Sequence, residues 1–269
     1  MIIDFHTHIF PEKIAEKTIE ILEGNILSNT GEVHKAAIPA TLEALRRSMK
    51  ENSIDASVVM PIATTLTQSA TINKFAQSIN NTDGIFSFGS LHPMQQDWEA
   101  VLYDIKEKGL RGIKLHPEYQ QFYIDSPESL RLLKKCEELD LMVMLHTGND
   151  IGVKPPSHCL PDRLRNILDH VSGEKIIAAH LGGWDAWDDV EKYLVGTPLY
   201  FDTAYTVTDI SESQLARIIR NHGTDKILFA TDSPWEAQGF TVKKLSSLGL
   251  TEDELDDIFY KNAKKLLKI

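Results

Sequence analysis

Short runs of apolar, β-favouring residues recur along the chain, and most of them are followed by a segment with helical periodicity. The runs lie at Ile2–Phe5, Ala56–Met60, Ile85–Leu91, Gly112–Leu115, Met142–Leu145, Lys175–Ala179, Leu199–Phe201 and Lys226–Ala230. Nearly continuous apolar character is typical of strands buried on both faces, as in a parallel sheet covered by helices. The pattern therefore predicts eight buried strands.

The segments between these runs carry apolar stripes and the terminal signals of helices. Pro11–Leu22 has proline at its start, places Ile14 and Ile21 on one stripe, and is followed by Gly24 as a stop signal. A capping box is predicted at Thr251, with glutamate three residues later. The other predicted helices are Ala40–Lys50, Thr71–Ile79, Asp97–Lys108, Pro127–Leu139, Pro161–Val171, Trp184–Val195, Glu212–His222 and Glu252–Leu267, with Val242–Leu248 as a further turn or helix.

Strands that alternate with helices in this way predict an α/β fold, the (β/α)8 or TIM barrel. We expect residues 1–269 to form one domain, because no long Pro/Gly/Ser-rich linker divides the chain. The polar segment Asn25–Pro39 is predicted to be a loop or a small insertion over the upper face. The alternative is an open, doubly wound sheet, but no G-x-G-x-x-G fingerprint follows a strand.

Composition narrows the functional classes. A net charge of −11 disfavours a nucleic-acid partner, because binding to phosphates needs clustered Lys and Arg. No apolar run approaches the roughly 20 residues of a membrane span, and the chain begins with a strand rather than the basic region of a signal peptide. We therefore expect a cytoplasmic protein. Cys136 and Cys159 are expected to be packed thiols rather than nucleophiles.

The first strand carries the motif His-Thr-His. Side chains alternate along a strand, so Asp4, His6 and His8 are predicted to share one face. Two imidazoles roughly 6–7 Å apart along a strand can converge on one metal ion where the strand ends at a cavity. The alternative is a pair of exposed histidines near a disordered terminus, which the apolar strand argues against.

Other strands also end in residues that carry chemistry. They are His92, Lys114, His116, His146, His180, Asp202 and Asp232. In a TIM barrel the carboxyl ends of the strands form one face, where active sites lie. Together with His6 and His8 of the first strand, six of the ten histidines fall at strand ends, so we expect one polar site there.

These motifs resemble the amidohydrolase superfamily. The resemblance rests on His-Thr-His in the first strand, a histidine ending the fifth, a histidine before Gly-Gly after the sixth, and Thr-Asp-Ser-Pro after the eighth. The opening Ile-Asp-Phe-His-Thr-His-Ile-Phe-Pro is similar to the amidohydrolase-related branch, which includes the decarboxylases related to aminocarboxymuconate-semialdehyde decarboxylase. The resemblance implies a TIM barrel of the metal-dependent hydrolase type.

Residue by residue, the resemblance places His6, His8, His146 and Asp232 on one divalent metal ion. Such a nitrogen and oxygen set suits Zn²⁺, with Mn²⁺ or Fe²⁺ as alternatives. His180 is expected to act as the acid/base beside it, and Asp232 could also accept a proton.

The remaining candidates have supporting roles. Lys114 matches the lysine that bridges two metals in many members, but His116 lies nearer the strand end, so a structural or supporting role is favoured. Asp4 could hold the second nitrogen of a ligand histidine. The others are His116, for substrate or for bracing the metal site; His92; Asp202, for substrate or a loop; and Trp235, for the pocket wall. Further histidines in loops or helices are His170, His222, and His34 or His158, which could join a lid.

Three activities fit this scaffold. The first is hydrolysis of an amide, lactone or ester of a small molecule by metal-activated water. The second is non-oxidative decarboxylation at the same metal, which would need cations such as Arg111, Lys154 or Arg163 in the pocket. The third is a TatD-type deoxyribonuclease, which expects a glutamate where His116 stands. We predict a hydrolase whose partner is a small-molecule substrate, with homo-oligomers possible.

Overall fold

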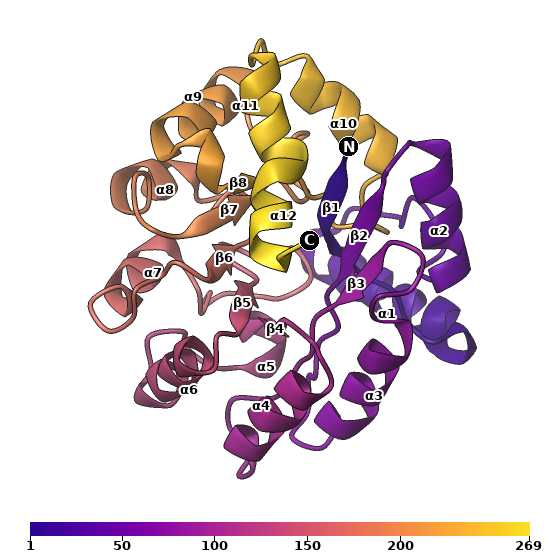
Figure 1. The fold of residues 1–269 in the computed structure, drawn as a ribbon, viewed down its shortest axis with the longest axis vertical. Helices are drawn as coiled ribbons and strands as arrows, with labels where there is room; N and C mark the ends of the chain where they lie inside the picture. The colour runs from indigo at the N-terminus through magenta and orange to yellow at the C-terminus, as the bar shows by residue number, and fades with distance from the viewer.

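The computed structural model describes residues 1–269 and contains eight parallel strands at its centre (Figure 1). Their pairing gives the orders β1-β2-β3 and β4-β5-β6-β7-β8. The strands are β1 (Ile3–Thr7), β2 (Ala56–Val59), β3 (Ile85–Ser87), β4 (Gly112–Leu115), β5 (Met142–Leu145), β6 (Ile176–Ala178), β7 (Tyr200–Asp202) and β8 (Ile227–Leu228). All eight predicted strands are therefore present.

Backbone hydrogen bonds bridge the two gaps between these sets of strands. Gly89, just after β3, donates to Gly112 O at 2.8 Å, and Lys114 donates to Gly89 O at 2.9 Å. On the other side, Phe5 donates to Phe229 O at 2.9 Å. The fold is the (β/α)8 type that the alternating pattern predicts, with helices in an outer ring around the strands (Figure 1).

The helices follow the strands in chain order. They are α1 (Glu12–Thr30), α2 (Leu42–Glu51), α3 (Ser69–Ile79), α4 (Trp98–Glu107), α5 (Pro117–Gln120), α6 (Pro127–Glu138), α7 (Pro161–Ile167), α8 (Trp187–Tyr193), α9 (Glu212–His222), α10 (Gln238–Ser246), α11 (Glu252–Asp256) and α12 (Asn262–Leu267). A 3-10 turn, η1 (Thr224–Lys226), precedes β8, and a π-helical turn, η2 (Asp257–Lys261), joins α11 to α12. The predicted capping box is present, because Thr251 and Glu254 exchange side-chain to backbone hydrogen bonds.

Helix α1 extends beyond its predicted end, and the short helix α5 was not predicted. Helix α1 continues through Gly24 to Thr30, so the first part of the predicted loop Asn25–Pro39 is helical and the stop comes at Gly31. Gly24 is exposed with open space around it, so nothing forces the chain to turn there, whereas Gly31 has the left-handed φ of 77° that ends a helix. The short helix α5 has no apolar period and was not predicted; it begins with Pro117, and the His116 side chain accepts from Tyr119 N.

Two layers of apolar side chains hold the barrel. The outer layer lies between strands and helices and includes Val59, Leu102 and Leu145. The inner layer fills the barrel, where Phe5 meets Phe88 edge-to-face at 6.0 Å. Leu267 of α12 belongs to the inner layer, so this helix closes the end of the barrel at which the strands begin (Figure 1). The opposite end is left for the polar strand ends.

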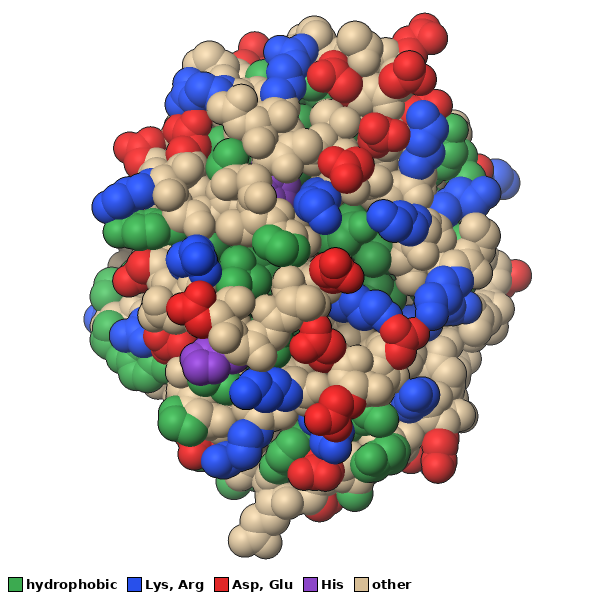
Figure 2. Space-filling view, turned by 60° about the vertical axis from the view of Figure 1, so that its left-hand side comes forward, with side chains coloured by type: hydrophobic (Ala, Val, Ile, Leu, Met, Phe, Trp, Pro, Cys, Tyr) green, Lys and Arg blue, Asp and Glu red, His purple; other side chains and the backbone are tan.

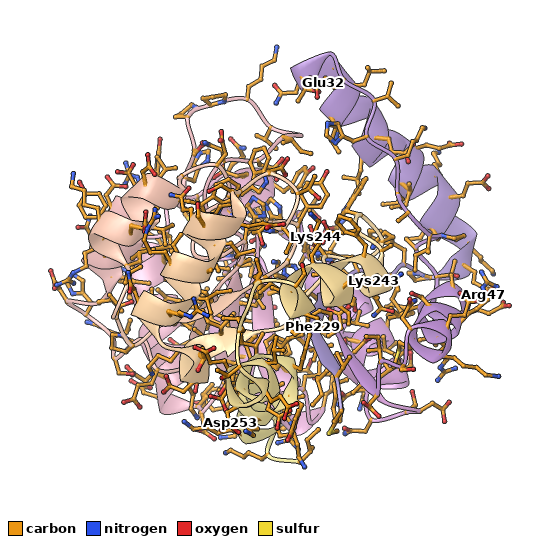
Figure 3. The ribbon with its side chains drawn as sticks, turned by 90° about the horizontal axis from the view of Figure 1, so that it is seen from above. Glu32, Arg47, Phe229, Lys243, Lys244 and Asp253 are labelled. Carbon is orange, nitrogen blue, oxygen red and sulfur yellow. The ribbon has the colours of Figure 1, made fainter.

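Glu32, just after α1, and Asp253 of α11 lie at opposite extremes of the molecule in the view of Figure 3.

No helix has the length and apolarity that crossing a bilayer requires. On the face in Figure 2, Lys and Arg side chains alternate with Asp and Glu, without a continuous basic patch. This distribution offers no phosphate-binding stripe on that face.

Candidate metal centre and cavity

An irregularity in β1 determines which side chains point into the barrel. The pairing of β1 with β2 shifts register between Asp4 and Thr7, which breaks the simple alternation. Asp4 lies outside, where its carboxylate accepts from Gln238 Nε2 of α10 at 2.8 Å and from Thr231 Oγ1 at 2.6 Å. The expectation that Asp4 shares a face with His6 and holds a ligand ring is therefore wrong. Burial raises the pKa of Asp4 to about 7.

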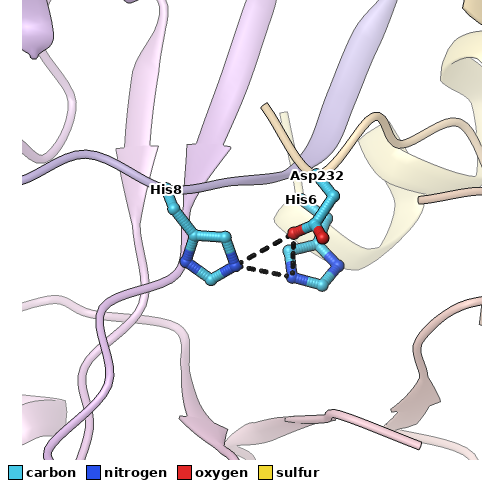
Figure 4. Close-up of side chains that lie close together, drawn as sticks. All are labelled: His6, His8 and Asp232. Carbon is cyan, nitrogen blue, oxygen red and sulfur yellow. Dashed lines mark hydrogen bonds and ion pairs between the residues drawn. The ribbon is translucent and has the colours of Figure 1, made fainter. Parts of the chain in front are cut away.

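Three side chains from the two ends of the chain converge at the end of the barrel where the strands terminate, which we call the upper end (Figure 4). His6 Nε2 lies 3.1 Å from His8 Nε2. Asp232 Oδ1 lies 3.4 Å from His6 Nε2 and 3.1 Å from His8 Nε2. We call this set the His6–His8–Asp232 group; it joins the end of β1 to the loop after β8.

Hydrogen bonds fix the tautomers of both imidazoles in this group. His6 Nδ1 donates to Asp202 Oδ2 at 2.8 Å, and His8 Nδ1 donates to Met60 O at 2.7 Å. A neutral imidazole has one proton, so each Nε2 presents a lone pair to Asp232. Three acceptor atoms therefore face one another, an arrangement that requires a proton or a cation between them.

The group fits a divalent metal ion. Ligand atoms about 2.0–2.1 Å from Zn²⁺ at tetrahedral angles lie roughly 3.3 Å apart, which matches the separations of 3.1 to 3.4 Å in this group. Burial holds the pKa of His6 well below its usual value, and the Lys114 charge lowers it further. Burial raises the pKa of Asp232, but His8, His180 and Lys114 outweigh this and hold it below its usual value. Both are in the deprotonated form that metal binding needs.

The Lys114 side chain reaches the same group. Its ammonium lies 3.0 Å from His6 Nε2, and its side chain is almost fully buried. Burial lowers the pKa of Lys114 to about 8, although the charges of Asp232 and Asp202 partly offset this. Lys114 thus places an ammonium group against one of the three acceptors, His6 Nε2.

Asp202 supports two histidines at once. While one oxygen accepts from the His6 ring, Oδ1 accepts from the backbone N–H of His180 at 2.8 Å and of Ala204 at 3.1 Å. The carboxylate is fully buried, and burial raises its pKa. The sequence left open whether Asp202 contacts substrate or a loop. In the structure Asp202 instead orients the His6 ring, and metal-binding histidines usually have such a contact.

His146 and His180 form a pair across from this group. His180 Nδ1 donates to Ala204 O at 2.8 Å, so its Nε2 carries a lone pair, which lies 3.0 Å from His146 Nδ1. His180 and Asp232 both have left-handed backbone angles, with φ of 58° and 60°. Non-glycine residues in this region are uncommon and cluster at functional sites. The fold thus fixes His180 with a basic nitrogen directed into the cavity.

A second cluster, the His116–His146–Asp150 group, adjoins the first. Asp150 Oδ2 lies 3.3 Å from the Nε2 atoms of both His116 and His146. The two rings stack with centroids 4.0 Å apart. Burial lowers the pKa of both imidazoles well below the usual value. Asp150 escaped the sequence analysis; the only available signal was an acid four residues after a strand-end histidine.

One cavity of about 830 Å³ joins both groups and opens at the upper end of the barrel. Trp235, whose backbone N–H donates to Asp232 O at 2.9 Å, lines it as the sequence indicated. His92 does not line it: the ring accepts from Met94 N at 3.2 Å and completes a turn, so the expected supporting role finds no geometric basis. His34, in contrast, reaches the cavity wall through Tyr205 at 3.1 Å.

The other candidates lie away from the cavity. His158 pairs with buried Glu118 at 2.5 Å, and His222 stacks on Phe201 behind β7. Cys136 and Cys159 are buried free thiols, and burial raises the pKa of both, as expected for inert packing residues.

The sequence matches one family model along nearly its whole length. The matching family is described as Amidohydrolase, and the match spans residues 3–269. No curated protein matches the sequence.

Solved structures share the fold at low sequence identity. An uncharacterized TIM-barrel protein from Bordetella bronchiseptica is 17% identical, with a TM-score of 0.75 over 99% of this chain and 98% of that one. A 5-carboxyvanillate decarboxylase from Novosphingobium aromaticivorans with bound manganese is 14% identical, with a TM-score of 0.71 over 100% and 97%. A putative 2-pyrone-4,6-dicarboxylic acid hydrolase from Pseudomonas putida is 14% identical, with a TM-score of 0.67 over 99% and 97%. At these identities the likeness concerns the fold.

Proposed function

This chain belongs to the amidohydrolase family, and we propose that it is a metal-dependent hydrolase of an uncharged amide, lactone or ester. The solved structures that share this fold include a putative hydrolase and a decarboxylase, so the choice between the two reactions depends on the site of this chain. The proposal covers the reaction, the metal ligands and the residue that moves the proton.

The charge of the cavity wall carries the choice between the two reactions. A decarboxylase must hold the carboxylate of its substrate, and a cationic side chain beside the metal would favour this. No arginine lines the cavity, and its one lysine, Lys114, faces the metal-ligand group. Arg163 instead pairs with Asp125 at 2.7 Å outside the cavity, and neither Arg111 nor Lys154 lines it. A neutral carbonyl compound suits this wall better than a carboxylate.

We assign His6, His8 and Asp232 as ligands of one divalent ion, with His146 as the fourth. His146 would bind the ion through Nδ1, which in this structure shares a proton with His180 Nε2. In the metal-bound protein that proton would lie on His146 Nε2, which is 3.3 Å from Asp150 Oδ2 and has no other hydrogen-bond partner in a buried position. The bound ion would polarise the carbonyl and lower the pKa of a water molecule towards neutrality. Zn²⁺ suits this donor set, and the manganese of a structural relative makes Mn²⁺ the first alternative.

His180 is proposed to move the proton. Its Nε2 is unprotonated because Nδ1 donates to Ala204 O at 2.8 Å, and the ring is held 5.6 Å from the His6 ring, centroid to centroid. In this position Nε2 can accept a proton from an attacking water and return it to the leaving group. Asp232 is the second acceptor available for the same proton.

Product analysis in isotopically labelled solvent tests the reaction. The metal-loaded protein is incubated with neutral lactones, esters and amides, and separately with unsaturated or aromatic carboxylates, in water enriched in oxygen-18. We expect the label in the carboxyl group of a hydrolysis product. Release of CO₂ with solvent deuterium on the product carbon, and no incorporated oxygen label, would overturn the proposal in favour of decarboxylation.

A further inference from the structure

One part of the cavity has a chemistry that the metal-ligand group does not explain. We call it the apolar arm, and it lies between α1 on one side and the stretch from the end of β2 through α3 on the other. It is lined by Ile19, Leu22 and Ile26 from the first side and by Ile62, Ile72 and Phe75 from the second. The arm is continuous with the His6–His8–Asp232 group, because the same cavity contains both.

No charged side chain faces the arm. The charged residues of the cavity wall are Lys114, Asp150 and Asp232, besides its histidines. Each is engaged at the barrel end, Lys114 with His6, Asp150 with His116 and Asp232 with His8. The polar groups along the arm are hydroxyls and amides, and Gln68 Oε1 already accepts from the backbone of Thr64 at 2.9 Å. A second carboxylate in the arm would be desolvated without a counter-charge, which is unfavourable.

Helix α1 leaves apolar surface uncovered on its cavity side. Ile14 and Ile21 both line the cavity but remain 50% and 55% exposed. Of the helix, only Ala15 and Ile26 are buried. Asn29 fixes its end by donating to Ile151 O at 2.8 Å, so the helix is held over the opening. An apolar group in the cavity would remove this surface from water, which is favourable in proportion to the area covered.

From this geometry we propose that the apolar arm binds an extended aliphatic or aryl substituent of the substrate, one without a second charge. The inference rests on the proposed function for the position of the reacting carbonyl, which lies at the metal-ligand end of the same cavity. Substrates with a distal carboxylate are excluded, because the arm offers no cation to pair with it.

Binding of neutral n-alkanols to the metal-free protein tests the arm without requiring turnover. Calorimetry with butanol, hexanol and octanol should give affinities that rise about fourfold per methylene. An ω-carboxylated chain of the same length should bind at least roughly tenfold more weakly than its alcohol. Affinities that are independent of chain length, or equal binding of the carboxylated chain, would overturn the inference.

Two leucines of α1 provide matched variants. Leu22→Asn changes a residue of the arm, whereas Leu27→Asn makes the same change on the same helix at a residue that is 47% exposed and does not line the cavity. Octanol affinity should fall roughly tenfold or more in the first variant and stay unchanged in the second. Metal binding should be unchanged in both, which controls for folding. Equal effects of the two substitutions would contradict the arm.

The outcomes separate the arm from the reaction. A chain-length gradient without hydrolysis of any carbonyl compound would refute the proposed function and retain the arm. Hydrolysis with kcat/KM independent of chain length would do the reverse. If a second copy of the chain fills the arm, light scattering will show an oligomer that octanol does not enter, and the inference fails.

Discussion

The two histidine groups of the cavity look alike in composition but differ in where their protons lie. In the His6–His8–Asp232 group, each ring gives its Nδ1 proton to an acceptor behind it, so both Nε2 atoms face Asp232 as lone pairs. In the His116–His146–Asp150 group, His116 Nδ1 accepts from Tyr119 N at 3.4 Å, so its Nε2 carries the proton and faces Asp150. The first group needs a cation, whereas the second already supplies protons to its carboxylate.

Hydrogen bonds behind a ring therefore decide whether two histidines and an aspartate form a metal site. Both groups contain two histidines and one aspartate, and the carboxylate lies 3.1–3.4 Å from the Nε2 atoms in the first group and 3.3 Å from them in the second. What differs is that a carboxylate and a carbonyl lie behind the first pair of rings, while a backbone N–H lies behind His116. This comparison can be broken or sharpened by substitution in either group.

The largest effect is expected from removing a histidine of each group. His8→Ala should abolish tight metal binding. The loss of affinity should exceed the roughly 10–100-fold loss that is typical when a residue hydrogen-bonded to a metal ligand is replaced. His116→Ala should retain the metal. Elemental analysis of chelator-free preparations should give about one ion per chain in the parent protein and the second variant. Two ions per chain, or a Lys114 whose mass has increased by one CO₂, would show that the two groups do not differ as described.

The next effect concerns His180, which stands between the groups. His180→Asn should keep the metal and the fold but lower kcat by about 10²–10⁴-fold, because the acid/base nitrogen is lost. Steady-state kinetics and metal content are measured on the same preparation. Loss of the metal together with activity would identify His180 as a ligand instead.

A smaller effect is expected from the carboxylates that hold the rings. Asp202→Asn should weaken metal binding by about 10–100-fold, because the amide cannot accept from His6 Nδ1 and from two backbone N–H groups with the same strength. Asp150→Asn should weaken it to a similar or smaller extent, through His146. Competition with a chromogenic chelator measures both. An unchanged affinity for Asp202→Asn would show that the tautomer of His6 is not what selects the metal.

The smallest effect comes from a buried acid outside both groups. The Glu236 carboxylate accepts hydrogen bonds from the hydroxyls of Thr241 and Thr208, and burial raises its pKa from 4.5 to about 7. A folded-state pKa above the unfolded value means that the stabilisation is complete below about pH 4.5 and is lost as pH rises through 7.

Between pH 5 and pH 8 the unfolding free energy of the parent protein should therefore fall by about 1–3 kcal/mol more than that of Glu236→Gln. Urea unfolding at the two pH values measures this in the parent and in the variant. The same pH slope in both proteins would show that Glu236 does not titrate in this range.

The sequence alone determined the fold and indicated which side chains at the strand ends would lie close together. Apolar runs spaced by helical periods suffice for the barrel, because strands buried on both faces and helices with one apolar stripe have few other ways to pack. His6, His146, His180 and Asp232 each follow or end a predicted strand, and this position in the sequence is enough to predict that they share one face of the barrel. The stop of α1 was misplaced, since an exposed glycine costs a helix only about 1 kcal/mol.

Tertiary structure decided which donor atoms point where. The register shift between Asp4 and Thr7 directs His6 into the barrel while Asp4 faces outward, so the two do not share a face as simple alternation predicts. Asp150 joined the site from a loop, and Asp202 came to lie behind His6 although 196 positions separate them. The tautomers follow from such long-range partners, because the hydrogen bond behind an imidazole depends on a strand that is adjacent only in the folded barrel. The apolar arm likewise exists only once α1 lies across the opening beside α3, since its two walls are separate in sequence and meet through the fold.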